Sequence, residues 1–411
     1  MKIWFKLLFG AIIGIILGIF LPANGGTTLD FLKQFSDTII RIGRYALFPL
    51  LFFSLATGIF KLRENKKTVR VYLRTIIYMI LFSAVLTIIG ALTVLLLSPA
   101  RIPIIIEQGA PLEVKNLAQY IEALLPLNFF SIFNSQGNFL LPIFGGALII
   151  GLNLNFDKQI TMPAIDFFDA MSRIFSRIND LIVEVMGFGM IVLGSYLTMQ
   201  IRVTPSLELF RQLLLVLSAD FILIVFGLFP AMLYLLTPGK ENPYKWLYST
   251  IAPAISAFLS GDNFFALPYL IKTGHDNLGI PRRVGSTTFP LFAIFGKAGT
   301  GLVTAVSFVV ILKSYSSLGI TINGIIWVIG VSFLLSFLTG NYPAAGFLVA
   351  ISFMCTLYGQ GLEEGYLILT PIIPLLISFS VILNTISSAV ASFLIAEHED
   401  MRKDVEVENY I

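Results

Sequence analysis

Two charged residues lie inside apolar stretches of this sequence, where charge is costly. Asp262 interrupts the run FLSGDNFFALP (258–268), and Lys297 lies within LFAIFGKAGTGLVTAV (291–306). An ammonium at the centre of a membrane helix costs about 2.5–3.5 kcal/mol, so such groups usually pair or serve a function. A nearby carboxylate would keep Lys297 charged, and Asp262 is the carboxylate at depth in this half of the chain. We therefore expect the two to pair, either as a structural link or at a site that holds a substrate or replaces a cation.

Composition places the chain in a lipid bilayer. Of its 411 residues, 56% are hydrophobic and 12% are charged, and the mean hydropathy is +0.88. Soluble proteins carry about 25% charged residues, and their own surface could not cover so much apolar area. The net charge of +3, without a basic domain, argues against a nucleic-acid partner.

Eight apolar segments are long enough to cross a bilayer as helices, which takes about 20 residues. They lie at roughly 7–22, 38–60, 73–97, 139–155, 180–200, 212–237, 284–312 and 366–396. The first is interpreted as a span rather than a signal peptide because no A-x-A cleavage pattern follows it. Lysines and arginines are concentrated in the N-terminus and in the 61–74 loop. The positive-inside rule therefore predicts cytoplasmic termini for a multi-pass protein of the cell membrane.

Two further segments, at 246–272 and 322–358, are interrupted near their middle. The first 14 residues of the earlier segment, before its polar break, would reach about 21 Å as a helix, short of the roughly 30 Å core. The later one is broken by TGNYPAAG (339–346), whose glycines and proline are poor in helix interiors. We expect two re-entrant helical hairpins, a pattern that points to a transporter binding site between repeats.

Nearly the whole chain resembles, in order, the dicarboxylate/amino acid:cation symporter family, which includes the glutamate transporters. The resemblance is carried by RIGRYALFPLLFFSLATGIF, LLPLNFFSIFNSQGNFLLPIFGGALIIGL, APAISAFLSGDNFFALP, FPLFAIFGKAGTGLV, TGNYPAAGFLVAISFM and LNTISSAVASFLIAEHED. It implies an all-α membrane protein of eight transmembrane helices and two re-entrant hairpins, with inverted repeats. It also implies a homotrimer in which a static scaffold supports a moving transport unit, an elevator-type transporter.

The resemblance divides the chain into scaffold and transport unit. Scaffold helices 1–2 are expected in 1–72, transport-unit helix 3 in 73–98 and scaffold helices 4–5 in 99–205. The rest of the transport unit is expected in 206–411, and its parts are helix 6, hairpin 1 at about 246–272, helix 7 at about 284–313, hairpin 2 at about 322–358 and helix 8 at about 366–397.

The sequence departs from the family at the positions that bind cations. Where the seventh-helix motif of the family reads N-M-D-G-T, this chain has Gly296, Lys297, Ala298, Gly299 and Thr300. Four functional residues of the family's eighth helix (aspartate, arginine, asparagine and aspartate) correspond here to Ile377, Ser380, Asn384 and Ser388. The sodium-site positions Gly296, Ala298, Asn384 and Ser388 are thus degenerate, because sodium prefers hard oxygen ligands that carboxylates supply best. We therefore expect no bound metal and no cofactor.

A solute site is implied where the hairpin tips meet the seventh and eighth helices. Its expected residues are Asp262, Asn263, Lys297, Thr300, Asn341, Tyr342, Pro343, Ala344, Ala345, Gly346, Ser380 and Asn384. Two of these have a second interpretation. Asn384 could hold helices together by hydrogen bonds, and Tyr342 could be an anchor at the membrane interface.

The expected function is a non-enzymatic symporter of a small organic solute, an amino acid or a dicarboxylate. Sodium coupling is doubtful, which leaves proton coupling or ion-independent transport open. One alternative is a degenerate family member that binds solute without coupled transport. A remote alternative is an intramembrane aspartyl protease that uses Asp220 and Asp262.

Overall fold

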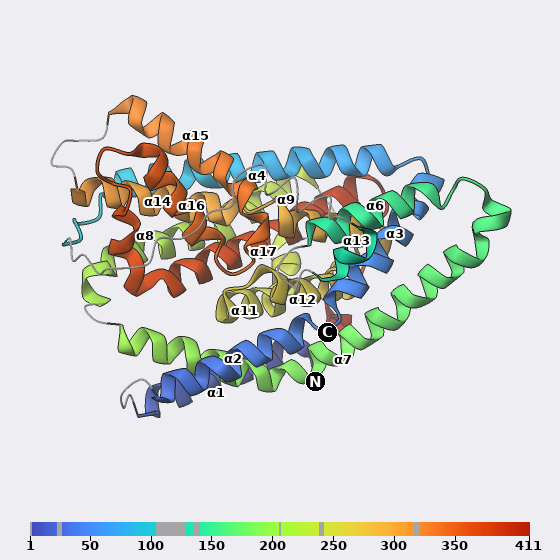
Figure 1. The fold of residues 1–411 in the computed structure, drawn as a ribbon, viewed down its shortest axis with the longest axis horizontal. Coiled ribbons are helices and arrows are strands. Elements are labelled where there is room, and N and C mark those ends of the chain that lie inside the picture. The colour runs from blue at the N-terminus through green and yellow to red at the C-terminus, as the bar shows by residue number, and fades with distance from the viewer. Residues whose placement is uncertain are drawn as a thin grey trace.

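The computed structural model describes residues 2–22, 27–103, 128–134, 140–204, 207–237, 242–315 and 321–411 (Figure 1). Within those ranges all regular elements are helical, as predicted. In chain order the α-helices are α1 (Ile3–Phe20), α2 (Thr27–Arg44), α3 (Leu47–Glu64), α4 (Thr68–Leu97), α6 (Leu141–Asn153), α7 (Lys158–Val203), α8 (Arg211–Ile222), α9 (Phe229–Leu236), α10 (Pro243–Ser249), α11 (Ile251–Ser260), α12 (Asn263–Asp276), α13 (Arg282–Ile294), α14 (Ala298–Tyr315), α15 (Ile322–Leu338), α16 (Gly346–Tyr358) and α17 (Ile373–His398).

In the part of the chain that the structure describes, seven helical segments are long and apolar enough to cross a membrane, not the eight expected. The missing one is the expected span at 139–155. It forms α6, which has 13 residues and would reach only about 20 Å. Pro142 lies in the first turn of α6, and a proline is favoured there because its missing N–H has no partner in a helix's first turn.

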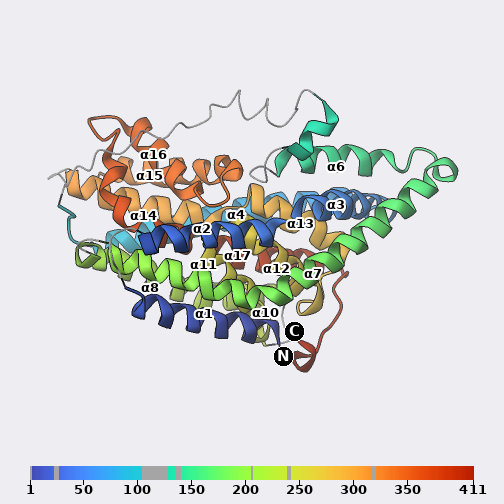
Figure 2. The same ribbon diagram turned by 60° about the horizontal axis from the view of Figure 1, so that its bottom comes forward.

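Helices α1, α2 and α7 run side by side along one face of the molecule (Figures 1 and 2). The approach of α1 to α7 depends on glycines spaced by four, Gly10, Gly14 and Gly18. A Cβ atom on Gly14 would overlap the carbonyl oxygen of Ile191 in α7. The Ser195 hydroxyl of α7 donates to the Gly14 carbonyl oxygen at 3.0 Å. This is the small-residue packing typical of membrane helices, which gain little from apolar burial in lipid.

Helices α14 and α17 form the interior of the other part of the molecule. All residues of α14 from Ala298 to Leu312 are buried, and α14 packs against α4, α15, α16 and α17. The short pair α11 and α12 packs against α17 and also against α1, α2 and α7. The site residues expected from the sequence are therefore held by interior helices, and α11 and α12 join these to the α1–α2–α7 face.

The two marked ends of the chain lie close together on the lower side of the molecule, right of its centre (Figure 1). The Lys2 ammonium donates to the Val407 carbonyl oxygen at 3.4 Å. Glu399 is only 3% exposed and forms ion pairs with Lys67 at 3.7 Å and Arg74 at 3.0 Å. The basic residues at the start of α4 are therefore joined to the C-terminal segment, which also contacts Lys2.

Candidate functional site

A tight turn joins α11 to α12 and places a carboxylate inside an apolar segment. Gly261 has φ of +59°, a left-handed conformation that glycine adopts without steric cost. Asp262 follows as the N-cap of α12 and accepts hydrogen bonds from the backbone N–H groups of Phe264 at 2.8 Å and Phe265 at 2.9 Å. These bonds satisfy N–H groups that a helix start leaves unpaired. A carboxylate thus interrupts the run 258–268 because a helix begins there, at depth.

The partner of Asp262 is Arg44, not Lys297. Asp262 is 1% exposed, and its carboxylate forms an ion pair with the guanidinium of Arg44 at the end of α2. The guanidinium carbon also lies 5.8 Å from the centre of the Phe264 ring. The expected Lys297–Asp262 pair is wrong, because each side chain has a different set of partners.

Lys297 lies in the break between α13 and α14. Its side chain is completely buried. The ammonium donates to two backbone carbonyl oxygens, that of Thr339 at 2.6 Å and that of Tyr342 at 2.9 Å. Lys297 thus connects the break in the seventh-helix segment to the loop between α15 and α16.

The loop between α15 and α16 is packed tightly against this break. It contains a 3₁₀ turn over Thr339–Asn341. A Cβ atom on Gly340 would lie 2.6 Å from the Ile294 carbonyl oxygen at the end of α13. One on Gly346 would lie 3.4 Å from the Lys297 Nζ atom. Gly340 therefore permits a close approach that a larger residue would prevent, whereas the space at Gly346 is at the limit of ordinary contact.

The two turns also contact each other directly. The carbonyl oxygen of Pro343 accepts from the backbone N–H of Asn263 at 3.1 Å and from its side-chain amide at 3.0 Å. The Asn384 amide nitrogen of α17 donates to Asn263 Oδ1 at 3.3 Å and to Thr300 Oγ1 at 3.1 Å. The Thr300 hydroxyl lies 2.8 Å from that of Ser380. One buried network of polar groups thus joins α12, α14, α17 and the 339–346 loop.

The structure brings together most of the expected site residues. Those that make contacts within the network or at its lysine are Asn263, Lys297, Thr300, Tyr342, Pro343, Gly346, Ser380 and Asn384. Ala344 and Ala345 lie half-buried in the same loop. The side chain of Asn341 is outside the described residues. Asp262 is next to the network in sequence but is bound to Arg44.

The four degenerate sodium positions offer few cation ligands. Gly296 and Ala298 have no polar side chain, and the side-chain oxygen of Asn384 accepts from the Thr300 N–H at 3.2 Å. Ser388 contributes one buried hydroxyl without a hydrogen-bond partner among the described residues. Across the described ranges there is no group of three or more acidic, histidine or cysteine residues that could hold a metal ion. These residues do not fit a sodium site built on carboxylates.

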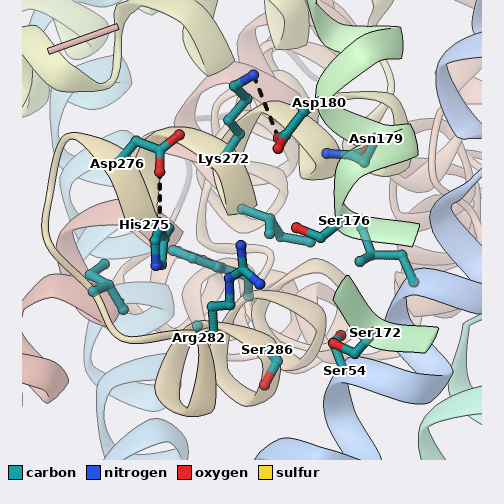
Figure 3. Close-up of a pocket in the computed structure, with 15 residues that line it drawn as sticks. Ser54, Ser172, Ser176, Asn179, Asp180, Lys272, His275, Asp276, Arg282 and Ser286 are labelled. Atoms are coloured by element: carbon teal, nitrogen blue, oxygen red, sulfur yellow. Dashed lines mark hydrogen bonds and ion pairs between the residues drawn. The ribbon is translucent and has the colours of Figure 1, made fainter. Parts of the chain in front are cut away.

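A second polar region lies between α3, α7, α12 and α13, away from this network (Figure 3). Lys272 lies within α12 and is 8% exposed. Its ammonium is 3.5 Å from Asp180 and 3.6 Å from Glu184, both on α7. This second polar region surrounds a crevice that is also lined by four hydroxyl side chains, those of Ser54, Ser172, Ser176 and Ser286.

Sequence reasoning missed Arg44 and Lys272 as buried partners. A signal existed for Arg44, since it stands in RIGRYALF, within the expected span 38–60, which contains no acidic residue. For Lys272 the carboxylates are about 90 residues away in the chain. Only the fold brings α7 to α12.

Comparison with known proteins gives matches along the whole chain. It is 27% identical over 183 residues to a C4-dicarboxylate transport protein of Bordetella avium, a match that covers 41% of this chain and 39% of that protein. It is 24% identical over 369 residues to the serine/threonine transporter SstT of Lacticaseibacillus paracasei, covering 86% and 78%. It is 20% identical over 418 residues to a proton/sodium-glutamate symport protein of Geobacillus stearothermophilus, covering 99% and 96%.

These relatives differ in how much of their length is matched. The chain spans about two fifths of the C4-dicarboxylate relative but most of the other two. The sequence profile of the sodium:dicarboxylate symporter family matches residues 3–398. Because that match takes in nearly every residue, the chain belongs to the sodium:dicarboxylate symporter family, a family of membrane transporters and not of enzymes.

Proposed function

We propose that this protein is a secondary active transporter of a small organic solute, an amino acid or a dicarboxylate. The observation that carries the proposal is the network at Asn263, Pro343, Thr300 and Asn384, where two interrupted segments meet two interior helices. Broken helices that meet inside a bundle are a common way to build a transporter site. Family membership and seven apolar helices already make the chain a multi-pass membrane protein.

The two interrupted segments are proposed to be re-entrant hairpins. In the first, α11 has 10 residues and α12 has 14, which gives lengths of about 15 and 21 Å. In the second, α15 has 17 residues and α16 has 13, or about 26 and 20 Å. Each arm is shorter than the roughly 30 Å core, so that each segment returns to the side from which it enters.

A carboxylate of the solute is the group that this region suits best. Helices α12, α14 and α16 begin at Asn263, Ala298 and Gly346, all beside the network. Helix starts carry unpaired N–H groups and a partial positive charge, which favour anions. Lys297 adds a full positive charge at the same place. The side chain of the solute has no arginine on α17 to meet it, because Ser380 stands at that position.

Transport is proposed to follow from movement of one part of the molecule against the other. The α1, α2, α3, α6 and α7 part would be the scaffold, and α8 to α17 with α4 the moving unit, in a homotrimer. The two parts meet where α1 packs on α11, α2 on α12 and α3 on α13. Both termini are proposed to lie in the cytoplasm, which the basic residues at the start of α4 and their contact with the C-terminal segment support.

A binding protein without transport is the second candidate, favoured by the lost family residues at Ala298 and Ser388. The intramembrane protease is no longer proposed, since the family is one of transporters and Asp262 is bound to Arg44.

The test uses purified protein and a panel of C4-dicarboxylates, serine, threonine and glutamate, the solutes in the names of the relatives. A ligand is identified by a rise in melting temperature, and its uptake is then measured in proteoliposomes. Asn384→Ala is expected to abolish the thermal shift, whereas Thr385→Ala keeps it. Thr385 is the matched control because its hydroxyl bonds only within α17, to Val381 at 2.8 Å. Binding without uptake would favour the second candidate, and no response to any solute would contradict the proposal.

A further inference from the structure

The environment of the Lys297 ammonium differs from that of an ordinary buried lysine. Among the described residues no carboxylate is its partner, and the groups that receive its hydrogen bonds are the backbone carbonyls of Thr339 and Tyr342. Its side chain has no exposed surface. Hydrogen bonds to these carbonyls favour the charged form of the amine, in place of the carboxylate expected from the sequence.

One of those carbonyls lies directly at the end of a half-helix, and the other lies three residues further on, after the 3₁₀ turn. Helix α15 ends at Leu338, and the Thr339 carbonyl follows directly. The C-terminal end of a helix carries a partial negative charge, and its last carbonyls have no partner within the helix. In transporters with discontinuous helices, such ends and unwound carbonyls coordinate the coupling cation. The 339–342 backbone is therefore arranged as a receptor for a cation.

The cation bound by these carbonyls is the ammonium of Lys297, which is part of the chain itself. An ammonium donates three hydrogen bonds and bears one positive charge, so it can replace a monovalent ion among carbonyl oxygens. Gly346 lies beside it, and a Cβ atom there would lie 3.4 Å from Nζ, at the limit of ordinary contact. The ammonium therefore takes the place at the loop that a dissolved cation would need.

We propose that Lys297 acts as a tethered cation that holds the 339–346 loop closed over the site, so that closure of this transporter needs no sodium. The inference rests on the proposed function in taking the loop as the gate of the solute site. It goes further in assigning the place of sodium, the ion in the family's name, to the ammonium of Lys297.

The test of this proposal measures how accessible the 339–346 loop is to a thiol reagent, rather than transport. Ala344→Cys is introduced in a Cys355→Ala background, because Cys355 is the single cysteine of the chain. The rate of labelling by a small thiol reagent is compared in sodium and in choline buffer. With Lys297 present we expect slow labelling at the same rate in both buffers. Sodium-dependent protection of this cysteine would overturn the proposal without any change to the lysine.

Lys297→Met is the informative variant, because methionine has a similar shape but no charge. Loss of two charge-assisted hydrogen bonds is expected to raise the labelling rate in choline by about tenfold or more. Sodium or lithium is expected to slow it again, since the vacated carbonyls can then bind a dissolved ion. An unchanged rate, or no response to either ion, would contradict the proposal.

Lys313→Met is the control on the same helix, since that ammonium bonds to Ser98 Oγ at 2.7 Å, far along α14 from the loop. It should leave the labelling rate as it is. If Lys297→Met does not fold, the labelling rates in sodium and in choline of the protein that keeps Lys297 still test the proposal. Solute uptake is measured separately: a loop that closes without sodium in a protein that takes up no solute would contradict the proposed function and leave this inference standing.

Discussion

Arg44 at the end of α2 and Asp262 at the start of α12 form a buried ion pair that joins the two parts of the molecule. Close packing accompanies it, because a Cβ atom on Gly43 would overlap the Phe265 ring. In the proposed transport cycle α12 moves against α2, so this pair must break and the Asp262 carboxylate must find water or another donor. The pair is therefore a latch for the state seen here.

Removing either partner of the latch should have unequal effects. Arg44→Ala leaves a carboxylate buried without its counter-ion, and we expect a loss of about 3–5 kcal/mol in the free energy of unfolding. Asp262→Asn should cost less, since asparagine also caps helices and Arg44, at 16% exposed, can reach water. The double variant should lose less than the sum. Thermal unfolding in detergent measures all three, and additive losses would show that the two residues do not interact.

Lys297 and Asp262, unlike Arg44 and Asp262, are expected to show no coupling energy. Because they bind different partners, the effects of Lys297→Met and Asp262→Asn on melting temperature are expected to add within about 0.5 kcal/mol. A coupling energy above about 1 kcal/mol would mean that the two charges meet in a state other than this one.

Gly14 and Gly330 form a matched pair for testing the α1–α7 contact. Gly14→Ala places a methyl group on the Ile191 carbonyl oxygen and should destabilise by about 1–3 kcal/mol. Gly330→Ala in α15 meets nothing within 4 Å and should be neutral or stabilising by up to about 1 kcal/mol. The same thermal assay compares them. Equal shifts would argue against close packing at Gly14.

Asp220 is a fully buried carboxylate of α8 with no cationic partner among the described residues. A charge in such a place is costly, whereas an amide of the same shape is much less so. We expect Asp220→Asn to raise the melting temperature while it leaves solute binding intact. A stable variant that binds but no longer transports would instead assign Asp220 a part in coupling.

The sequence was sufficient for the all-helical fold and for the meeting of Asn263, Thr300 and Asn384. Apolar length, the breaks at 260–263 and 339–346, and the family resemblance carry that information. It was insufficient for ion pairing, since Coulomb attraction depends on distances that only packing sets. Asp262 has two possible cations in the same interior region, and the N-cap geometry of α12 directs it to Arg44. The backbone carbonyls that bind Lys297 could not be identified from the sequence, because every residue has a carbonyl group.

The burial of Lys297 on the 339–346 loop also bears on the response of transport to voltage. A dissolved coupling ion crosses once per cycle and draws about 2.3 kcal/mol per charge from a potential of 100 mV. A cation fixed to the chain returns with the empty carrier, so its net displacement over a full cycle is zero and the potential does no work on it. In transport without proton coupling, the current would then report the charge of the solute alone: none for a zwitterion, and an outward driving force on a dianion in a cell that is negative inside.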